Sequence, residues 1–150
     1  MDKRIERKEI MTINEAQDEI IEEFEMLEEW FDRYQLIIDY GKDLPPMPET
    51  DRTERNLIDG CQSKVSFTAR MEEGKVVYTG YSDAILVRGI VAILIRVLSG
   101  HTPKEIIEAD LYLIDAIGLR EHLSPTRSNG VTAMLKQMRL YALAFSAMKE

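Results

Sequence analysis

The stretch Ala84–Leu98 constrains the fold more than any other part of this sequence, because its apolar side chains cover nearly all sides. It has 15 positions, whereas strands usually run about 4–8 residues, so its length favours a helix. Its valine and isoleucine content also suits a buried strand. A membrane span needs about 20 residues, and this stretch is interrupted by Arg88. We therefore predict a central buried helix, with Gly89 allowing close packing.

The residues before this stretch predict one long helix followed by a connector. Thr12 and Glu15 have the spacing of a capping box, which marks a helix start. Apolar residues then follow at alternating spacings of four and three, which places them on one helical face: Ile20, Phe24, Leu27, Phe31, Tyr34 and Ile38. Gly41 is a plausible end of this helix. The proline-rich residues 44–48 predict an extended connector, and residues 49–60 a polar loop.

A β-hairpin is predicted after this loop. Apolar residues alternate with polar ones at Val65, Phe67, Ala69 and Met71, which is the period of a strand with one buried face. Residues 73–74 (Glu-Gly) form a turn signal, and residues 75–79 predict the returning strand. We expect the strand to end at Gly80.

Capping signals mark the remaining helices. Ser82 is a candidate cap for the central helix, with Asp83 in its first turn. Proline follows a capping residue at Thr102 and again at Ser124, and each pair predicts a helix start. Residues 110–118 predict another short helix. With so few strands, the best fit is an α+β fold, a small antiparallel sheet packed by helices. We expect residues 1–11 to be a flexible leader and residues 12–150 to form a single domain.

The charge balance limits the partners. The formal net charge is −8, from 19 basic and 27 acidic residues, which argues against nucleic acid or a membrane surface as a partner. The first residues contain no apolar run, so no secretory signal is expected. Cys61 is the single cysteine, so the chain has no internal disulfide and cannot build a cysteine-rich metal site alone. These features predict a cytoplasmic protein with a free thiol and no bound metal.

Cys61 is also the leading candidate for chemistry. It follows Gly60 where a polar loop meets a strand, so the thiol can project from a tight turn. The alternative is a small buried apolar residue, as most free cysteines are. A cysteine hydrolase would need a histidine base, but His101 and His122 both have the setting of loop or capping residues. Arg127 stands out because the helix dipole disfavours a cation in a first turn. A carboxylate, a backbone carbonyl or an anionic ligand is expected to compensate, unless its side chain is simply solvated.

Several short motifs, taken in order, resemble the SufE family of iron–sulfur cluster assembly. They are Gly60-Cys61-Gln62-Ser63, Ser82-Asp83-Ala84, Arg88-Gly89 and Leu123-Ser124-Pro125-Thr126-Arg127 with Gly130. The segment Trp30-Phe31-Asp32-Arg33-Tyr34 is similar to that family's first helix, and the resemblance runs from about residue 13 to the end. One departure is Ser66, where the family often has tryptophan; this could change the local hollow or partner surface.

The resemblance implies a sulfur acceptor. It implies that Cys61 carries sulfur as a persulfide from a pyridoxal-phosphate cysteine desulfurase (SufS-like) and raises that enzyme's turnover. It also implies delivery to a SufBCD-like scaffold, a fold like the IscU-type scaffold, and a possible homodimer. The pyridoxal phosphate (PLP) belongs to the desulfurase, so we expect no cofactor on this chain and no independent turnover.

The resemblance also assigns residues around the thiol. Gly60, Gln62 and Ser63 would shape the loop, while Asp83 and Arg127 would be neighbours or docking residues. Arg127 would favour a thiolate or persulfide anion. A non-catalytic adaptor of the same fold, which binds a desulfurase or scaffold without carrying sulfur, is the main alternative. An unrelated thiol peroxidase or hydrolase is a third, but it would need a second redox or base residue.

Overall fold

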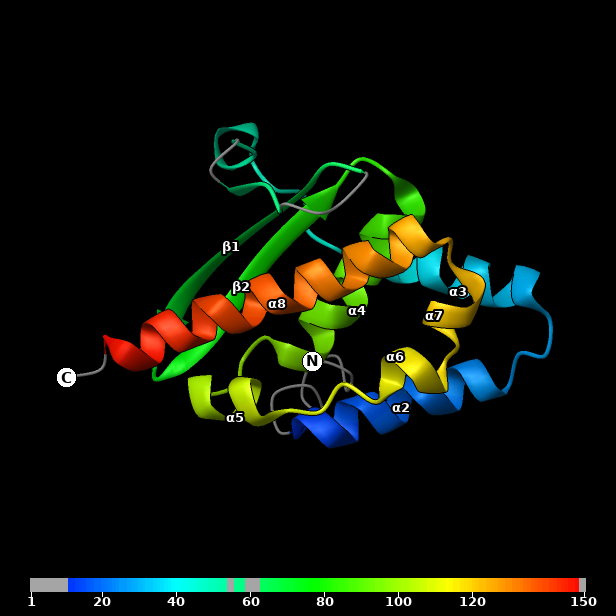
Figure 1. Ribbon diagram of the computed structural model, residues 1–150, viewed down its shortest axis with the longest axis horizontal. Helices are drawn as coiled ribbons and strands as arrows, with labels where there is room; N and C mark the ends of the chain where they lie inside the picture. Colours follow the sequence, from blue (N-terminus) through cyan, green and yellow to red (C-terminus); the bar gives the residue numbers. More distant parts are fainter. Residues whose placement is uncertain (1–10, 54–55, 59–62, 149–150) are drawn as a thin grey trace.

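The computed structural model describes residues 11–53, 56–58 and 63–148, and it has the predicted α+β fold (Figure 1). In chain order the elements are α2 (Ile13–Glu25), α3 (Trp30–Lys42), the 3-10 turn η1 (Glu49–Asp51), β1 (Val65–Glu72), β2 (Lys75–Ser82), α4 (Ile85–Leu98), α5 (Pro103–Glu108), α6 (Leu113–Ala116), α7 (Leu119–His122) and α8 (Pro125–Ala147). Of the predicted leader (residues 1–11), residues 1–10 lie outside the described residues, while Met11 packs against the core. No helix in the described ranges is long and apolar enough to cross a membrane.

The central helix α4 confirms the strongest sequence prediction. Ten of its residues are buried, and it contacts α2, α3, α8 and strand β2. Its crossing with α3 is so close that a Cβ added at Gly89 would lie 1.9 Å from the carbonyl oxygen of Ile37. Gly41 lies on the other side of the same crossing, where an added Cβ would be 2.8 Å from the Gly89 nitrogen. Glycine at both positions therefore lets the two helix backbones touch.

The hairpin is longer than predicted. β1 and β2 pair antiparallel from Val65 opposite Ser82 to Glu72 opposite Lys75. The turn residues Glu73 and Gly74 both have positive φ, 52° and 80°, as a tight two-residue hairpin turn requires. The prediction that β2 ends at Gly80 is wrong. An added Cβ there would lie 2.8 Å from Cγ1 of Val91, so Gly80 lets the strand continue beneath α4.

Two tyrosines fix the hairpin to α8. The hydroxyl of Tyr78 donates to the carbonyl of Met138 at 2.6 Å, and that of Tyr141 donates to the carbonyl of Phe67 at 3.1 Å. Burial raises the pKa of Tyr78, so the phenol keeps its proton and remains a donor. These links join the sheet to the helix whose first turn carries Arg127.

The single first helix predicted from residue 12 to residue 41 is wrong, because the chain forms two helices. The break falls at Glu29, whose backbone is extended with φ −88° and ψ 137°. The guanidinium Nε of Arg33 donates to the carbonyl of Leu27 at 2.8 Å and stabilises the bend. Phe31, predicted to be buried, is 76% exposed, while Trp30 stacks on His122 with ring centroids 3.6 Å apart. Tertiary packing of α3 against α4 and α7 therefore overrides the local apolar spacing.

A second small correction concerns the start of α4. Ser82 is the last residue of β2, and Ala84 is the cap position, so Asp83 precedes the helix rather than lying in its first turn. Ser82 is 1% exposed, and its hydroxyl accepts from the Ala84 amide at 3.3 Å. Ser82 therefore still stabilises the start of α4, although it lies two residues before the N-cap position.

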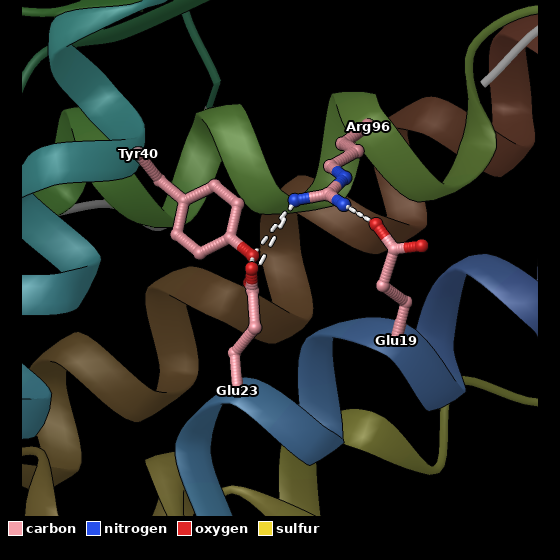
Figure 2. A network of polar contacts seen from close by, with 4 residues as sticks. All are labelled: Glu19, Glu23, Tyr40 and Arg96. Carbon is pink, nitrogen blue, oxygen red and sulfur yellow. Dashed lines mark hydrogen bonds and ion pairs between the residues drawn. The ribbon is translucent and has the colours of Figure 1, made fainter. Parts of the chain in front are cut away.

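A polar network joins the three N-terminal helices of the core (Figure 2). Arg96 of α4 forms an ion pair with Glu19 of α2 and donates to the hydroxyl of Tyr40 of α3 at 2.8 Å. Tyr40 in turn donates to Glu23. Burial and this bond to Glu23 raise the pKa of Tyr40, so the phenol remains protonated. The network gives partners to Arg96, the cation in the last turn of a largely apolar helix.

His101 extends the hairpin pairing and gives the fold a pH dependence. Its carbonyl accepts from the Val76 amide at 2.8 Å. Burial lowers the pKa of its imidazole below 6.5, with Lys75 adding to the effect and Glu105 opposing it. The folded chain thus binds fewer protons at this imidazole than the unfolded chain. The resulting contribution to the free energy of unfolding is present above pH 6.5 and is lost as the pH falls towards the folded pKa.

We therefore expect the free energy of unfolding to fall between about pH 7 and about pH 5, and His101→Gln to reduce that slope. Urea unfolding at several pH values measures the slope. A slope unchanged in His101→Gln would show that the imidazole does not contribute. Glu105 acts at lower pH, because its bonds to Thr102 lower the pKa of its carboxyl below 4.5.

Candidate functional site

A small apolar hollow lies where β1 begins and where α4 and α8 approach it. Its lining comes from the start of the hairpin and the first turns of both helices: Ser63, Val65, Val87, Ile90, Thr126, Arg127, Gly130 and Met134. The space open to the centre of a water molecule is about 10 Å³, which is room for about one water. The hollow brings together two residues, Ser63 and Arg127, that the sequence motifs place more than sixty positions apart.

The predicted persulfide residue itself cannot be placed. Gly60, Cys61 and Gln62 lie outside the described residues. Ser63, two positions after Cys61, is half-buried at the rim of the hollow, and Val65 is fully buried in its wall. The described residues that follow Cys61 in the sequence therefore enter β1 at this hollow.

Arg127 owes its position to the start of α8. The hydroxyl of Ser124 accepts from the Arg127 amide at 3.3 Å, and Pro125 occupies the first helical turn, as the sequence predicted. Arg127 is exposed and makes no ion pair with any described residue. Its charge adds to the positive end of the helix dipole, so the rim of the hollow favours an anion.

Asp83 lies outside the hollow, in a separate cluster beside the loop that leads to Cys61. Its carboxylate is 3.8 Å from the guanidinium of Arg52 and largely exposed. Arg52 and Arg88 both lie over the ring of Tyr81, at 4.4 and 4.6 Å from the ring centroid. Arg52 also donates to the carbonyl of Met47 at 2.9 Å, which fixes the residues before the loop. Sequence reasoning missed a role for Arg52 and Tyr81; the only signal was Arg88, a cation in an apolar stretch.

The two sides of the cysteine segment are joined by backbone contacts. The Ile58 amide donates to the Val65 carbonyl at 2.9 Å, and Leu57 forms a bridge with Ser66. Ser66, where the family often has tryptophan, is 4% exposed and lies opposite Tyr81 in the sheet. A small residue here is thus fully covered by the chain and presents almost no surface to a partner.

The described residues include no group of three or more His, Cys, Asp or Glu side chains placed to hold a metal ion. Neither His101 nor His122 is among the residues that line the hollow. His122 stacks on Trp30, and its Nδ1 is 3.1 Å from the Gly118 carbonyl. An apolar floor with one cation at its rim suits the shelter of a single sulfur anion, because the floor limits water and the cation stabilises charge.

The chain is thus an α+β domain whose hairpin begins beside the first turns of α4 and α8. The chain belongs to the SufE family: the family model, described as an Fe-S metabolism associated domain, matches residues 18–142. This membership places the chain in iron–sulfur metabolism and implies a cysteine desulfurase as its partner.

Curated relatives agree with the family, and one solved structure agrees with the fold. The chain is 44% identical over 126 residues to an uncharacterized SufE-like protein of Synechocystis, covering 84% of this chain and 79% of the relative. It is 42% identical over 127 residues to another from Rhizobium meliloti, covering 81% and 91%. The solution structure of a hypothetical protein from Thermus thermophilus matches with a TM-score of 0.71 at 24% identity, covering 86% and 94%. The last match shows the fold alone.

Proposed function

We propose that this protein accepts sulfur from a cysteine desulfurase as a persulfide on Cys61 and delivers it to a SufBCD-like iron–sulfur scaffold. The observation that carries the proposal is the hollow beside Ser63, with its apolar floor and with Arg127 at its rim. In this proposal the pyridoxal phosphate stays on the desulfurase, and this chain contributes only the acceptor thiol and its surroundings.

The transfer is a thiol–disulfide type of exchange. The Cys61 thiolate attacks the outer sulfur of the persulfide on the desulfurase cysteine. A new S–S bond forms on Cys61 while the old S–S bond breaks, and its electron pair leaves on the desulfurase cysteine as a thiolate. Sulfur is neither gained nor lost by the pair, and no external oxidant or reductant is needed. Arg127 supports the step by stabilising negative charge at the rim of the hollow.

The presence of one cysteine fits this role. A second thiol near the persulfide would attack it and release sulfide, so a carrier gains from having none. Cys61 is the single cysteine in the sequence. One thiol holds one persulfide, but it cannot provide the ligand set of a thiolate-bound cluster.

Incubation with a cysteine desulfurase and cysteine, followed by intact-mass measurement without reductant, tests the proposal. We expect a gain of one or more sulfur atoms, located on the peptide that contains Cys61. If the desulfurase forms its own persulfide, binds this protein and still transfers no sulfur, the carrier function is wrong and the chain acts as an adaptor.

Replacing Arg127 with glutamate is expected to slow sulfur transfer about tenfold, because a carboxylate at the rim repels the anion that the cation stabilises. The initial rate of persulfide formation, measured by quenched mass spectrometry, reports the effect. Arg70→Glu is the matched control, since Arg70 is an exposed arginine near the hairpin turn, where it pairs with Glu72. Equal rates for both variants would show that Arg127 has no part in the transfer.

A further inference from the structure

A second and larger concavity lies away from the hollow, along the middle of α8, with one lining residue each from α5 and α7. We call it the α5–α8 groove; its lining residues are Ile107, Arg120, Thr132, Leu135, Lys136, Arg139, Leu140 and Leu143. Its volume is about 340 Å³, and none of these residues lines the hollow beside Ser63. The sequence-based and family-based predictions assign it no role.

The groove exposes apolar side chains on a helix that already has one buried face. α8 buries Val131, Met134 and Met138 in the core. Leu140 and Leu143 lie on a different face and are 46% and 54% exposed, beside Ile107 at 36%. Large apolar side chains gathered in one concavity are typical of interaction sites, whereas single exposed ones are ordinary.

The charges in the groove are all of one sign. Its lining includes three cations, Arg120, Lys136 and Arg139, and no acidic residue, although the chain as a whole has a net charge of −8. Arg120 is paired with Asp115 at 3.3 Å. Arg139 donates through Nη2 to the Ala109 carbonyl at 2.7 Å, whereas its buried Nε has no hydrogen-bond partner in the described part of the chain. A local cationic site in an acidic protein favours an anionic partner.

The spacing of the groove residues along α8 favours a helical partner. Positions 132, 136, 139 and 143 are separated by four, three and four residues, which is the repeat by which one helix packs along another. They cover about 16 Å, or about three helical turns. Lys136 and Arg139 can lay their aliphatic stems along an apolar stripe and direct their charges to its flanks.

From these observations we propose that the α5–α8 groove binds an amphipathic helix of a partner protein, with an apolar stripe against Leu140 and Leu143 and carboxylates beside Lys136 and Arg139. The most acidic helix of a second copy, α2, is not such a helix. It already buries its apolar face in the core through Ile13, Ile20 and Phe24.

Two synthetic peptides test the proposal on the full chain. Both are helix-stapled and carry a stripe of leucines; one has glutamates and the other has lysines at the positions that flank this stripe. We expect the acidic peptide to bind with a one-to-one stoichiometry in calorimetry and the basic peptide to bind at least about tenfold more weakly. Amide signals of α5 and of residues 132–143 should shift in NMR spectra.

Substitutions in the α5–α8 groove test whether the acidic peptide binds there. Leu143→Glu and Lys136→Glu are each expected to weaken the acidic peptide at least about tenfold, since one removes an apolar contact and the other reverses a charge. Lys42→Glu is the matched control, because Lys42 is an exposed cation of α3 paired with Asp39. Equal binding of both peptides, no binding of either, or an unchanged affinity in Leu143→Glu would overturn the proposal. So would a dimer in light scattering that Leu143→Glu dissociates, since the groove would then bind a second copy.

Discussion

Cys61→Ser is expected to abolish sulfur uptake completely while leaving the fold intact. A serine hydroxyl stays protonated near neutral pH and is a poor nucleophile towards sulfur, so no S–S bond can form at this position. The measurement is intact mass after incubation with a desulfurase and cysteine, with the far-UV circular dichroism and the melting temperature of the variant compared with those of the natural chain.

A relocated thiol separates the role of the position from the role of the thiol itself. In the double variant Cys61→Ser/Ser146→Cys, the chain again has one cysteine, now on an exposed part of α8. We expect this variant to gain no desulfurase-dependent sulfur, because its thiol lies outside the cysteine segment and the hollow. Sulfur uptake at the natural rate by either variant would contradict the proposed function.

Gly89→Ala is expected to destabilise the fold by about 3 kcal/mol or more, or to prevent folding. Helix propensity alone predicts the opposite sign, since alanine favours a helix by roughly 1 kcal/mol over glycine. The added Cβ would lie 1.9 Å from the Ile37 carbonyl oxygen, however, and a backbone atom of a packed helix cannot move aside without separating α3 from α4. Urea unfolding measures the change in free energy.

Gly74→Ala is the matched control for this change. Gly74 lies in the hairpin turn with φ +80°, and an added Cβ would meet nothing within 4 Å. Only the left-handed backbone is then costly, by about 1 kcal/mol. A loss in Gly89→Ala no larger than that in Gly74→Ala would show that the crossing of α3 and α4 can relax.

Local patterns in the sequence predicted the elements whose surroundings are simple. α4 could be predicted because it is apolar all round, and the hairpin because its period of two has one buried face. The starts of α5 and α8 were visible because each depends on a capping residue and a proline that follows it. In these elements local preference and tertiary packing favour the same structure.

The errors occurred where packing opposed the local pattern. The spacing through Leu27 and Phe31 is that of a continuous helix, but the stacking of Trp30 on His122 depends on α7, ninety residues further along. Gly80 does not end β2. A glycine is needed at this position because Val91, which lies on α4, packs against it. Neither partner can be found from the residues nearby in the chain.

The candidate site was predicted in part. Motif resemblance named Ser63 and Arg127, and the structure places both at one hollow. It also named Asp83 as a neighbour or docking residue; the structure places Asp83 in a cluster with Arg52 and Tyr81, and its docking role stays a prediction. That cluster depends on a cation and a ring from separate segments meeting in space, which no spacing in the sequence encodes.

The hydrogen bond between Ile58 and Val65 has a consequence for how sulfur can travel. It pins both ends of the segment that contains Cys61, and three residues of chain span at most about 10 Å. Covalent reach alone thus limits how far from Ile58 any group on residue 61 can act. Under the proposed function, donor and recipient must each come to the same edge of the molecule, so they take turns there and exclude one another.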